Sequence, residues 1–238
     1  MLRIAVLVSG RGTNLKAILD HVRAGRIKAE VALVLSNALD APALDHARAA
    51  GVAVWAEDHR SYPSRKAFDA AMMEAMTDAG VSAVVLAGYM RLLSGEFIRA
   101  YAGRIVNVHP SLLPAFPGVS GGADAVAYGV KIAGCTVHFV EEAMDAGAVI
   151  IQAATFVAET DTPETLMERV HTLEHRIYPQ AVAWLAEGRL ATEERGEGRV
   201  VRLAPSAASS LAPGRAKAAP APSVAEGAFV YPPLEEGF

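Results

Sequence analysis

The chain has 238 residues, a formal net charge of -4 and a sequence pI near 6.0. This charge balance supplies no clustered basic surface for nucleic acid, and no apolar run reaches the roughly 18 to 20 residues that a membrane-spanning helix requires. We therefore expect neither a nucleic-acid partner nor a membrane protein.

The cysteine content and the first residues indicate the compartment. Cys135 is the only cysteine, so an intramolecular disulfide is excluded, and its apolar neighbours indicate a small buried hydrophobe rather than a reactive thiol. The chain opens with the strand-like run Leu2–Val8 instead of a signal peptide. A cytoplasmic location is the expectation.

Short apolar runs alternate with longer helix-like stretches along most of the chain. Strands are expected at 3–8, 30–35, 52–55, 83–87 and 104–108, and helices at 14–24, 41–50, 64–79, 93–101, 121–130 and 163–187. Two further strands are expected at 134–140 and 148–157, joined by a turn at 141–147. The alternation predicts an α/β fold: an open, mostly parallel twisted sheet with helices on both faces and an antiparallel edge near residues 134–157.

The composition changes near residue 190. Residues 204–225 are dominated by Ala, Pro and Ser, which bury too little apolar surface to form a core. We therefore expect one domain at 1–190 that carries the chemistry and a C-terminal extension at 191–238 that is largely Ala/Pro/Ser-rich and flexible. Its last part, Phe229–Tyr231, is apolar enough to dock on another part of the chain.

A glycine-containing turn, Ser9–Asn14, follows the first predicted strand and opens a helix. Its backbone N–H groups and the helix dipole can hold a phosphate, although a tight turn alone would explain the glycines equally well. The turn lacks the third glycine of the dinucleotide fingerprint, and Ser36 and Asn37 stand where that fold places an acidic residue for the ribose. Both departures argue against a nicotinamide enzyme.

The segment Asn107–Pro114 places polar side chains at the end of a buried strand. Asn107 and His109 are two residues apart and should project from the same face, while Pro110 ends the strand. With Asp145 in the later turn, the chain offers an amide, an imidazole and a carboxylate for acyl-type chemistry. Taken singly, each has a plain structural explanation: an Asn that caps a turn, a His held by packing and an Asp chosen for its turn.

Five motifs in fixed order carry a family resemblance that runs from Ile4 to about Leu190. They are Ser9–Asn14, Ala87–Leu93, Asn107–Gly118, Thr136–Val140 and Met144–Gly147. In these motifs the chain resembles the glycinamide ribonucleotide formyltransferases, folate-dependent enzymes of purine synthesis. One departure is Ser120, where many members of the family carry His, so the resemblance does not specify the contacts of the neighbouring loop.

The resemblance implies an activity, a set of ligands and the residues that contact them. The implied reaction moves a formyl group from the co-substrate 10-formyltetrahydrofolate to glycinamide ribonucleotide, without a metal, and a homodimer is one possible assembly. The implied nucleotide contacts are Gly12, Thr13 and Asn14 for the phosphate and Glu174 for the ribose. The implied folate contacts are Arg65, Met90, Arg91, Leu92, Leu93, Asn107, Glu141, Glu142, Ala143, Met144 and Asp145. For Arg65 the plain alternative is a solvated arginine at a helix start, and for Met90–Leu93 it is core packing.

Formyl transfer needs a site for negative charge on the formyl oxygen and a proton path from the attacking amine to the leaving nitrogen. Asn107 can donate to the developing oxyanion, a contribution of about 3 kcal/mol when such a donor is preorganised. A protonated His109 can stabilise the same oxygen and deliver the proton to the leaving nitrogen. Asp145 favours the imidazolium by proximity and accepts the amine proton directly or through a water. His138 is expected to have a supporting role.

Other interpretations remain to be weighed against this one. His171, Glu174 and His175 match the H-x-x-E-H spacing of inverted zinc peptidases, a short pattern that also needs a third ligand. A methionyl-tRNA formyltransferase should continue into a basic domain, which the tail lacks, and a formyltetrahydrofolate hydrolase usually carries a regulatory domain before its first strand. A folate-binding module without catalysis is the remaining class.

Overall fold

The computed structural model describes residues 1–196, 198–205, 223–225 and 228–238. The chain divides into two compact units, one formed by Met1–Val108 and Phe139–Met144 and the other by His109–His138 and Asp145–Phe238. We call them unit 1 and unit 2. None of the helices in the described ranges combines the length and apolar character needed to cross a membrane.

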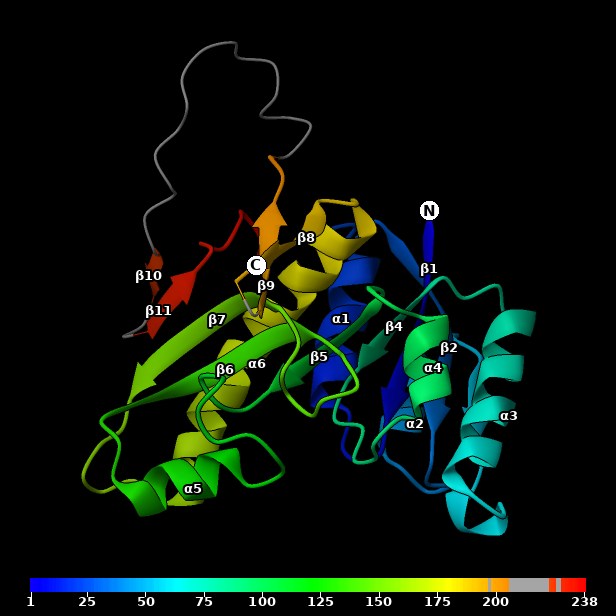
Figure 1. Ribbon diagram of the computed structural model, residues 1–238, viewed down its shortest axis with the longest axis horizontal. Coiled ribbons are helices and arrows are strands. Elements are labelled where there is room, and N and C mark those ends of the chain that lie inside the picture. Colours follow the sequence, from blue (N-terminus) through cyan, green and yellow to red (C-terminus); the bar gives the residue numbers. More distant parts are fainter. Residues whose placement is uncertain (197, 206–222, 226–227) are drawn as a thin grey trace. The chain divides into compact units, whose positions relative to one another are not determined.

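Unit 1 is built on five parallel strands in the order β5-β4-β1-β2-β3. Their bounds are β1 Leu2–Val8, β2 Ala29–Ser36, β3 Val54–Ala56, β4 Ala83–Leu86 and β5 Ile105–His109, whose last residue is the first of unit 2. The helices are α1 Thr13–Arg23, α2 Ala43–Ala49, the 3-10 turn η1 His59–Ser61, α3 Arg65–Asp78 and α4 Gly95–Ala100. Strand and helix alternate along the chain as Figure 1 shows.

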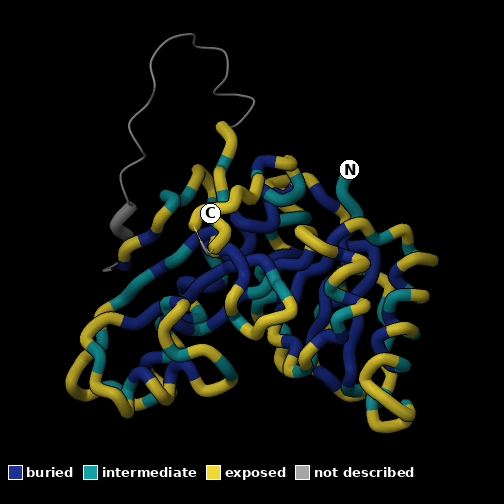
Figure 2. Tube along the Cα trace, viewed as in Figure 1, coloured by how far each residue is buried: buried dark blue, intermediate teal, exposed yellow. Residues whose placement is uncertain are grey.

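The strands of unit 1 are buried because helices cover both of their faces. Successive side chains on a strand point to opposite faces, and both members of neighbouring pairs such as Val6 and Leu7 are fully buried. Leu7 belongs to the cluster with Phe68 and Met72 of α3, while α1 and α2 contact β2 on their side. Figure 2 shows these strands as buried and the outer turns of α3 as exposed.

Unit 2 contains antiparallel strands and the longest helix. Its strands are β6 Ile132–Phe139, β7 Val149–Phe156, β8 Leu190–Arg195, β9 Gly198–Leu203, β10 Ser223–Ala225 and β11 Ala228–Tyr231, and its helices are α5 Gly121–Tyr128 and α6 Pro163–Ala186. The order β10-β11-β7-β6 is antiparallel throughout, and β8 pairs with β9 as a separate hairpin. A capping box between Thr162 and Thr165 opens α6, which then packs on β7.

The predicted α/β fold is confirmed. Unit 1 holds the parallel strands with helices on both faces, and the antiparallel strands expected near 134–157 are β6 and β7. Every predicted helix is present within a few residues, and α4 begins later than expected because Ser94 is its N-cap. The division of the chain at residue 190 stays a prediction.

The C-terminal extension contains structure that the sequence did not indicate. The expected docking segment Phe229–Tyr231 forms β11, which adds to β7 with Val230 buried opposite Ala153. Beyond it, Gln180 of α6 bonds to the carbonyl of Pro233 and the N–H of Glu235. Residues 206–222, which make up most of the stretch expected to be flexible, lie outside the described residues.

Candidate active site

His109 and Asp145 are held together in unit 2. His109 ends β5 with a side chain that is 5% exposed, and its Nδ1 lies 3.6 Å from Oδ2 of Asp145. Its Nε2 lies 2.9 Å from the carbonyl oxygen of Phe116. A carbonyl oxygen can only accept, so Nε2 carries a hydrogen. Both ring nitrogens thus face oxygen atoms, and the Nε2 contact is at hydrogen-bonding distance.

Asp145 receives contacts from three directions. Its Oδ2 accepts the backbone N–H of Gly118 at 2.8 Å, and its Oδ1 lies 3.8 Å from Nε2 of the buried His138. The backbone of Asp145 has φ 53°, in the left-handed region that Asp tolerates better than most side chains but that still costs free energy. The turn therefore keeps a strained conformation that points this carboxylate between His109 and His138.

Polar groups on two facing strands anchor the loop after His109. Thr136 of β6 and Gln152 of β7 are register partners. The Thr136 hydroxyl donates to the carbonyl of Ser111 at 2.7 Å and accepts the N–H of Leu113, and the Gln152 amide donates to the Leu113 carbonyl at 3.0 Å. Sequence reasoning did not single out this pair, although two polar residues inside apolar strands were a usable signal.

The glycine turn of unit 1 has the geometry of an anion-binding loop. Gly12 has φ 75° and is the N-cap of α1, and a Cβ there would lie 2.5 Å from Cβ of Ala43, so no other residue fits without movement. Thr13 and Asn14 begin the helix, and its first turn holds no acidic side chain that would repel an anion. A left-handed glycine at the N-cap and a first turn without acidic side chains are typical of helix starts that bind a phosphate.

The segment after β4 contains four of the predicted folate contacts, Met90, Arg91, Leu92 and Leu93. Met90 and Leu92 are 72% and 58% exposed, whereas Leu93 is buried in the core of unit 1. Arg91 places its guanidinium 5.4 Å from the centre of the Phe68 ring, a cation–π contact. Leu93 thus packs in the core of unit 1, while the two exposed apolar side chains are positioned where they can cover a flat ring.

The other predicted folate contacts lie elsewhere in unit 1. Arg65 is exposed at the first position of α3, Asn107 pairs with Leu86 of β4 in the sheet register, and Met144 is 56% exposed. The remaining ones are Glu141, which is half-buried, and Glu142 and Ala143, which are exposed, with Glu142 in an ion pair with Arg99 at 2.6 Å.

Further candidates lie in unit 2. Glu174 is 3% exposed on α6, and Ser120 is an exposed residue at the N-cap of α5. Burial and the nearby Glu174 charge raise the pKa of Cys135 well above its usual value, which confirms an unreactive buried thiol. Among the described residues, no group of three or more His, Cys, Asp and Glu side chains could hold a metal ion, and this includes the His171–His175 motif.

A buried acid of α3 supports the start of α4. Asp69 is 1% exposed and accepts the backbone N–H of Ser94 at 2.6 Å, directly after the Met90–Leu93 segment. Burial raises the pKa of Asp69, and the Ser94 hydrogen bonds and the charges of Arg91 and Arg65 oppose the rise. This residue was not identified from the sequence, where it appears as one of several charges on α3.

Removal of the Asp69 side chain is expected to destabilise unit 1. Asp69→Ala leaves the buried N–H of Ser94 unpaired, which should lower the free energy of unfolding by about 1–3 kcal/mol in urea titrations.

Asp69→Asn keeps an acceptor for Ser94 and cannot ionise. Because the folded-state pKa of Asp69 is raised, its ionisation destabilises the fold as pH rises from the unfolded value through the folded one. The stability of the Asn variant relative to the wild type should therefore improve from pH 4 to pH 7, and the opposite trend would contradict this account.

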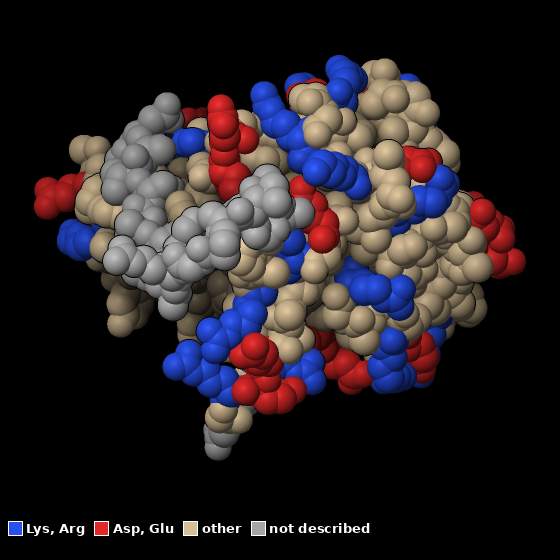
Figure 3. Space-filling view, turned by 90° about the horizontal axis from the view of Figure 1, so that it is seen from above, with Lys and Arg blue, Asp and Glu red and all other residues tan. Residues whose placement is uncertain are grey.

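The surface of the protein carries charges of both signs. On the face drawn in Figure 3, Lys and Arg side chains are interspersed with Asp and Glu, in keeping with the formal charge of -4. This charge distribution gives no general attraction for anions, so any anion-binding site must rely on local donors such as those at a helix N-terminus.

The chain is similar to known proteins in both sequence and structure. Residues 2–182 match the formyl transferase family model. The chain is 42% identical over 193 residues to the phosphoribosylglycinamide formyltransferase of Escherichia coli K12, covering 81% of this chain and 91% of that protein. A crystal structure of glycinamide ribonucleotide transformylase 1 from Symbiobacterium toebii matches with a TM-score of 0.82 and 53% identity, over 86% of this chain and 95% of that one.

Longer relatives contain the same region as one part. The trifunctional purine biosynthetic protein adenosine-3 of Bos taurus is 43% identical over 194 residues, which are 82% of this chain but only 19% of that protein. The chain thus spans less than a fifth of the length of this relative.

Proposed function

Since the chain belongs to the formyl transferase family, we propose that it transfers the formyl group of 10-formyltetrahydrofolate to the amine of 5'-phosphoribosylglycinamide. The products are formylglycinamide ribonucleotide and tetrahydrofolate, in purine biosynthesis. The observation that carries the proposal is the Asp145 carboxylate set between His109 and His138, in a chain that matches the Escherichia coli phosphoribosylglycinamide formyltransferase over most of its length.

The proposed mechanism uses three side chains. The substrate amine attacks the formyl carbon, and the formyl oxygen takes up negative charge, to which the Asn107 amide and the protonated His109 donate. The amine proton passes to Asp145, directly or through a water. His109 delivers a proton to the departing folate nitrogen as the bond between that nitrogen and the formyl carbon breaks. No covalent intermediate with the protein is required.

The proposed ligand contacts follow the family motifs. Gly12, Thr13 and Asn14 bind the nucleotide phosphate at the start of α1, and Glu174 contacts the ribose. Met90, Leu92 and Met144, each with an exposed apolar side chain, cover the folate ring system. The folate is a co-substrate, and no metal has a role in the mechanism. A cytoplasmic location and a homodimer remain predictions of this proposal.

The first experiment measures tetrahydrofolate release from 10-formyltetrahydrofolate with and without 5'-phosphoribosylglycinamide, and follows the formylated product in the same sample. Release that depends on the nucleotide and is matched by product supports the transferase. Equal release without the nucleotide would identify a hydrolase instead. Folate binding without any release would favour a binding module.

Replacement of Thr13 is expected to affect one substrate selectively. Thr13→Val removes a hydroxyl at the proposed phosphate site, and a hydrogen bond to a charged group contributes about 1.5–3 kcal/mol, so the KM for the nucleotide should rise roughly 10- to 100-fold. The KM for the folate should stay near the wild-type value. Thr77→Val is the matched control because Thr77 is exposed on α3 and its hydroxyl donates to the Met73 carbonyl in the same helix. A rise in the folate KM alone would contradict the proposed assignment.

A further inference from the structure

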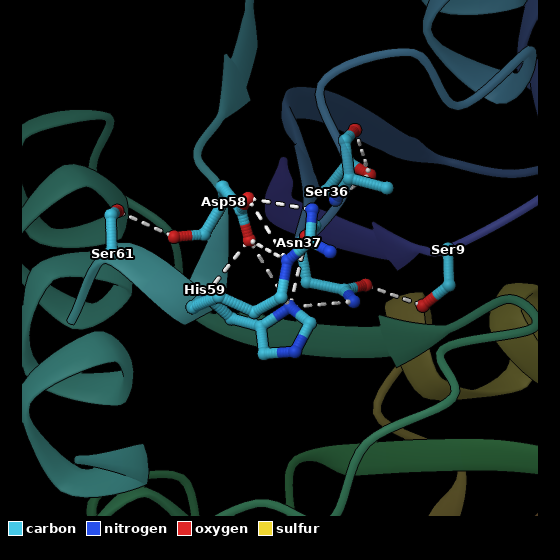
Figure 4. A network of polar contacts seen from close by, with 8 residues as sticks. Ser9, Ser36, Asn37, Asp58, His59 and Ser61 are labelled. Atoms are coloured by element: carbon cyan, nitrogen blue, oxygen red, sulfur yellow. Dashed lines mark hydrogen bonds and ion pairs between the residues drawn. The ribbon is translucent and has the colours of Figure 1, made fainter. Parts of the chain in front are cut away.

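The Ser9 hydroxyl lies between two loops of unit 1 and bonds to both. Ser9 directly follows β1, and its Oγ donates to Oδ1 of Asn37 at 2.5 Å and accepts the backbone N–H of Met90 at 2.9 Å. The backbone N–H of Ser9 donates to the carbonyl of Gly88 at 3.1 Å. Figure 4 shows the side chains of Ser9 and Asn37 pointing toward each other. Ser9 thus ties the start of the anion loop to the Met90–Leu93 segment.

Asn37 is itself held from its other side. Nδ1 of His59 lies 3.2 Å from the Asn37 carbonyl oxygen and 3.5 Å from its Nδ2. Because a carbonyl oxygen only accepts, Nδ1 of His59 carries the hydrogen and donates to Asn37. Hydrogen bonds from Arg60 lower the pKa of Asp58 to about 2, so a carboxylate stays 3.9 Å from the same His59 nitrogen. The network in Figure 4 therefore joins the segments that follow β1, β2 and β3.

The outer part of this network borders a hollow. Asn37, Asp58 and His59 line a hollow of about 410 Å³ together with Ala38, Leu39, Asp40 and Arg60. The side chain of His59 is 30% exposed. On its inner side the network reaches the core of unit 1, because Asn37 is only 9% exposed and the His59 ring meets the ring of Phe68 edge-on, with the centroids 6.2 Å apart.

We propose that Ser9 is a positioning residue whose hydroxyl, oriented by Asn37, fixes the Met90 amide and thereby holds the Met90–Leu93 segment in the conformation that receives the folate. This inference rests on the proposed function, which assigns the folate to that segment. It adds two residues, Ser9 and Asn37, that have no assigned role in the reaction.

The orientation of the hydroxyl is the physical reason. A serine hydroxyl has one hydrogen, and here that hydrogen goes to Asn37, so its lone pairs are left for the Met90 N–H. Without Ser9 Oγ, the Met90 N–H loses its acceptor and the Asn37 side-chain oxygen loses its donor. Met90 and Leu92 are largely exposed, so packing alone holds their side chains weakly and the backbone bond becomes decisive.

The test compares variants that remove different parts of the network. Ser9→Ala removes both bonds and should raise the folate KM roughly 10-fold while changing kcat less. Asn37→Ala leaves Ser9 Oγ in place as an acceptor and should have a smaller effect. Ser9→Thr keeps the hydroxyl and should restore the wild-type KM. Ser61→Ala is the matched control, because the Ser61 hydroxyl lies in the same region and donates to the Asp58 carbonyl rather than to Asn37 or Met90.

Two measurements separate this inference from the proposed function. Amide hydrogen exchange of Met90, followed without ligands, should be faster in Ser9→Ala and unchanged in Ser61→Ala. Calorimetric titration with tetrahydrofolate should show weaker binding to Ser9→Ala. Both readouts remain decisive if the wild type transfers no formyl group. Unchanged Met90 exchange in Ser9→Ala, or faster exchange with unchanged tetrahydrofolate binding, would overturn the positioning role.

Discussion

Asp145→Asn is expected to lower kcat for formyl transfer by roughly 10²- to 10⁴-fold, the range that a positioned acid–base group contributes. The variant keeps an oxygen that can accept the Gly118 N–H, so the turn should persist. It loses the carboxylate that lies 3.6 Å from His109, which is the proton acceptor of the proposed mechanism. Steady-state turnover together with tetrahydrofolate titration checks this, and binding should change far less than kcat.

A matched control is available in the same unit. Asp124 is an exposed residue in the first turn of α5, and Asp124→Asn should leave turnover unchanged. If Asp145→Asn retains near wild-type turnover, the proton path through this carboxylate is wrong. A large loss of tetrahydrofolate binding with little loss of kcat would instead make Asp145 a folate contact without a role in proton transfer.

The main elements of the fold could be predicted from local patterns. Continuous apolar runs such as Ile4–Val8 indicate strands that are covered on both faces, and the structure buries every residue of this run. The expected helices were placed by the longer stretches between these runs, and the one late start, that of α4, follows from the N-cap Ser94, whose side chain accepts the Phe97 N–H. These signals are local in the chain, which is why sequence alone was sufficient.

The β8–β9 hairpin shows what local patterns miss. Its strands are largely exposed, so they lack the apolar alternation by which a strand is recognised. Cross-strand ion pairs join it instead, with Glu194 to Arg199 and Glu193 to Arg202 both at 2.8 Å. In the sequence these charges look like part of a low-complexity tail. Strand β11 was missed as a strand because its pairing with β7 depends on residues more than 70 positions away.

The candidate site was predictable only where side chains carry the chemistry. His109 and Asp145 could be named because they stand in motifs of the family resemblance and carry an imidazole and a carboxylate, and the structure brings them together. The Phe116 carbonyl and the Gly118 N–H, which complete their contacts, are backbone groups that every residue possesses. Loop conformation alone decides where such groups point, so no residue type indicated them.

His109→Ala is expected to reduce kcat by roughly 10²- to 10⁴-fold, because in the proposed mechanism the imidazole both stabilises the formyl oxygen and supplies the proton to the leaving nitrogen. His138→Ala is the comparison within the same cluster, since His138 is equally buried and lies 3.8 Å from the other oxygen of Asp145. Its supporting role predicts a smaller loss of kcat. Thermal unfolding of both variants identifies any loss that arises from misfolding.

The combination of His109→Ala with Asp145→Asn gives the sharper result. If the two side chains act as one unit, the double variant should be little slower than the slower single variant, because the second substitution removes a function already lost. Independent roles would instead multiply the two losses of kcat. A multiplicative result would mean that Asp145 accepts the amine proton without any help from His109, even though their charged groups lie 3.6 Å apart.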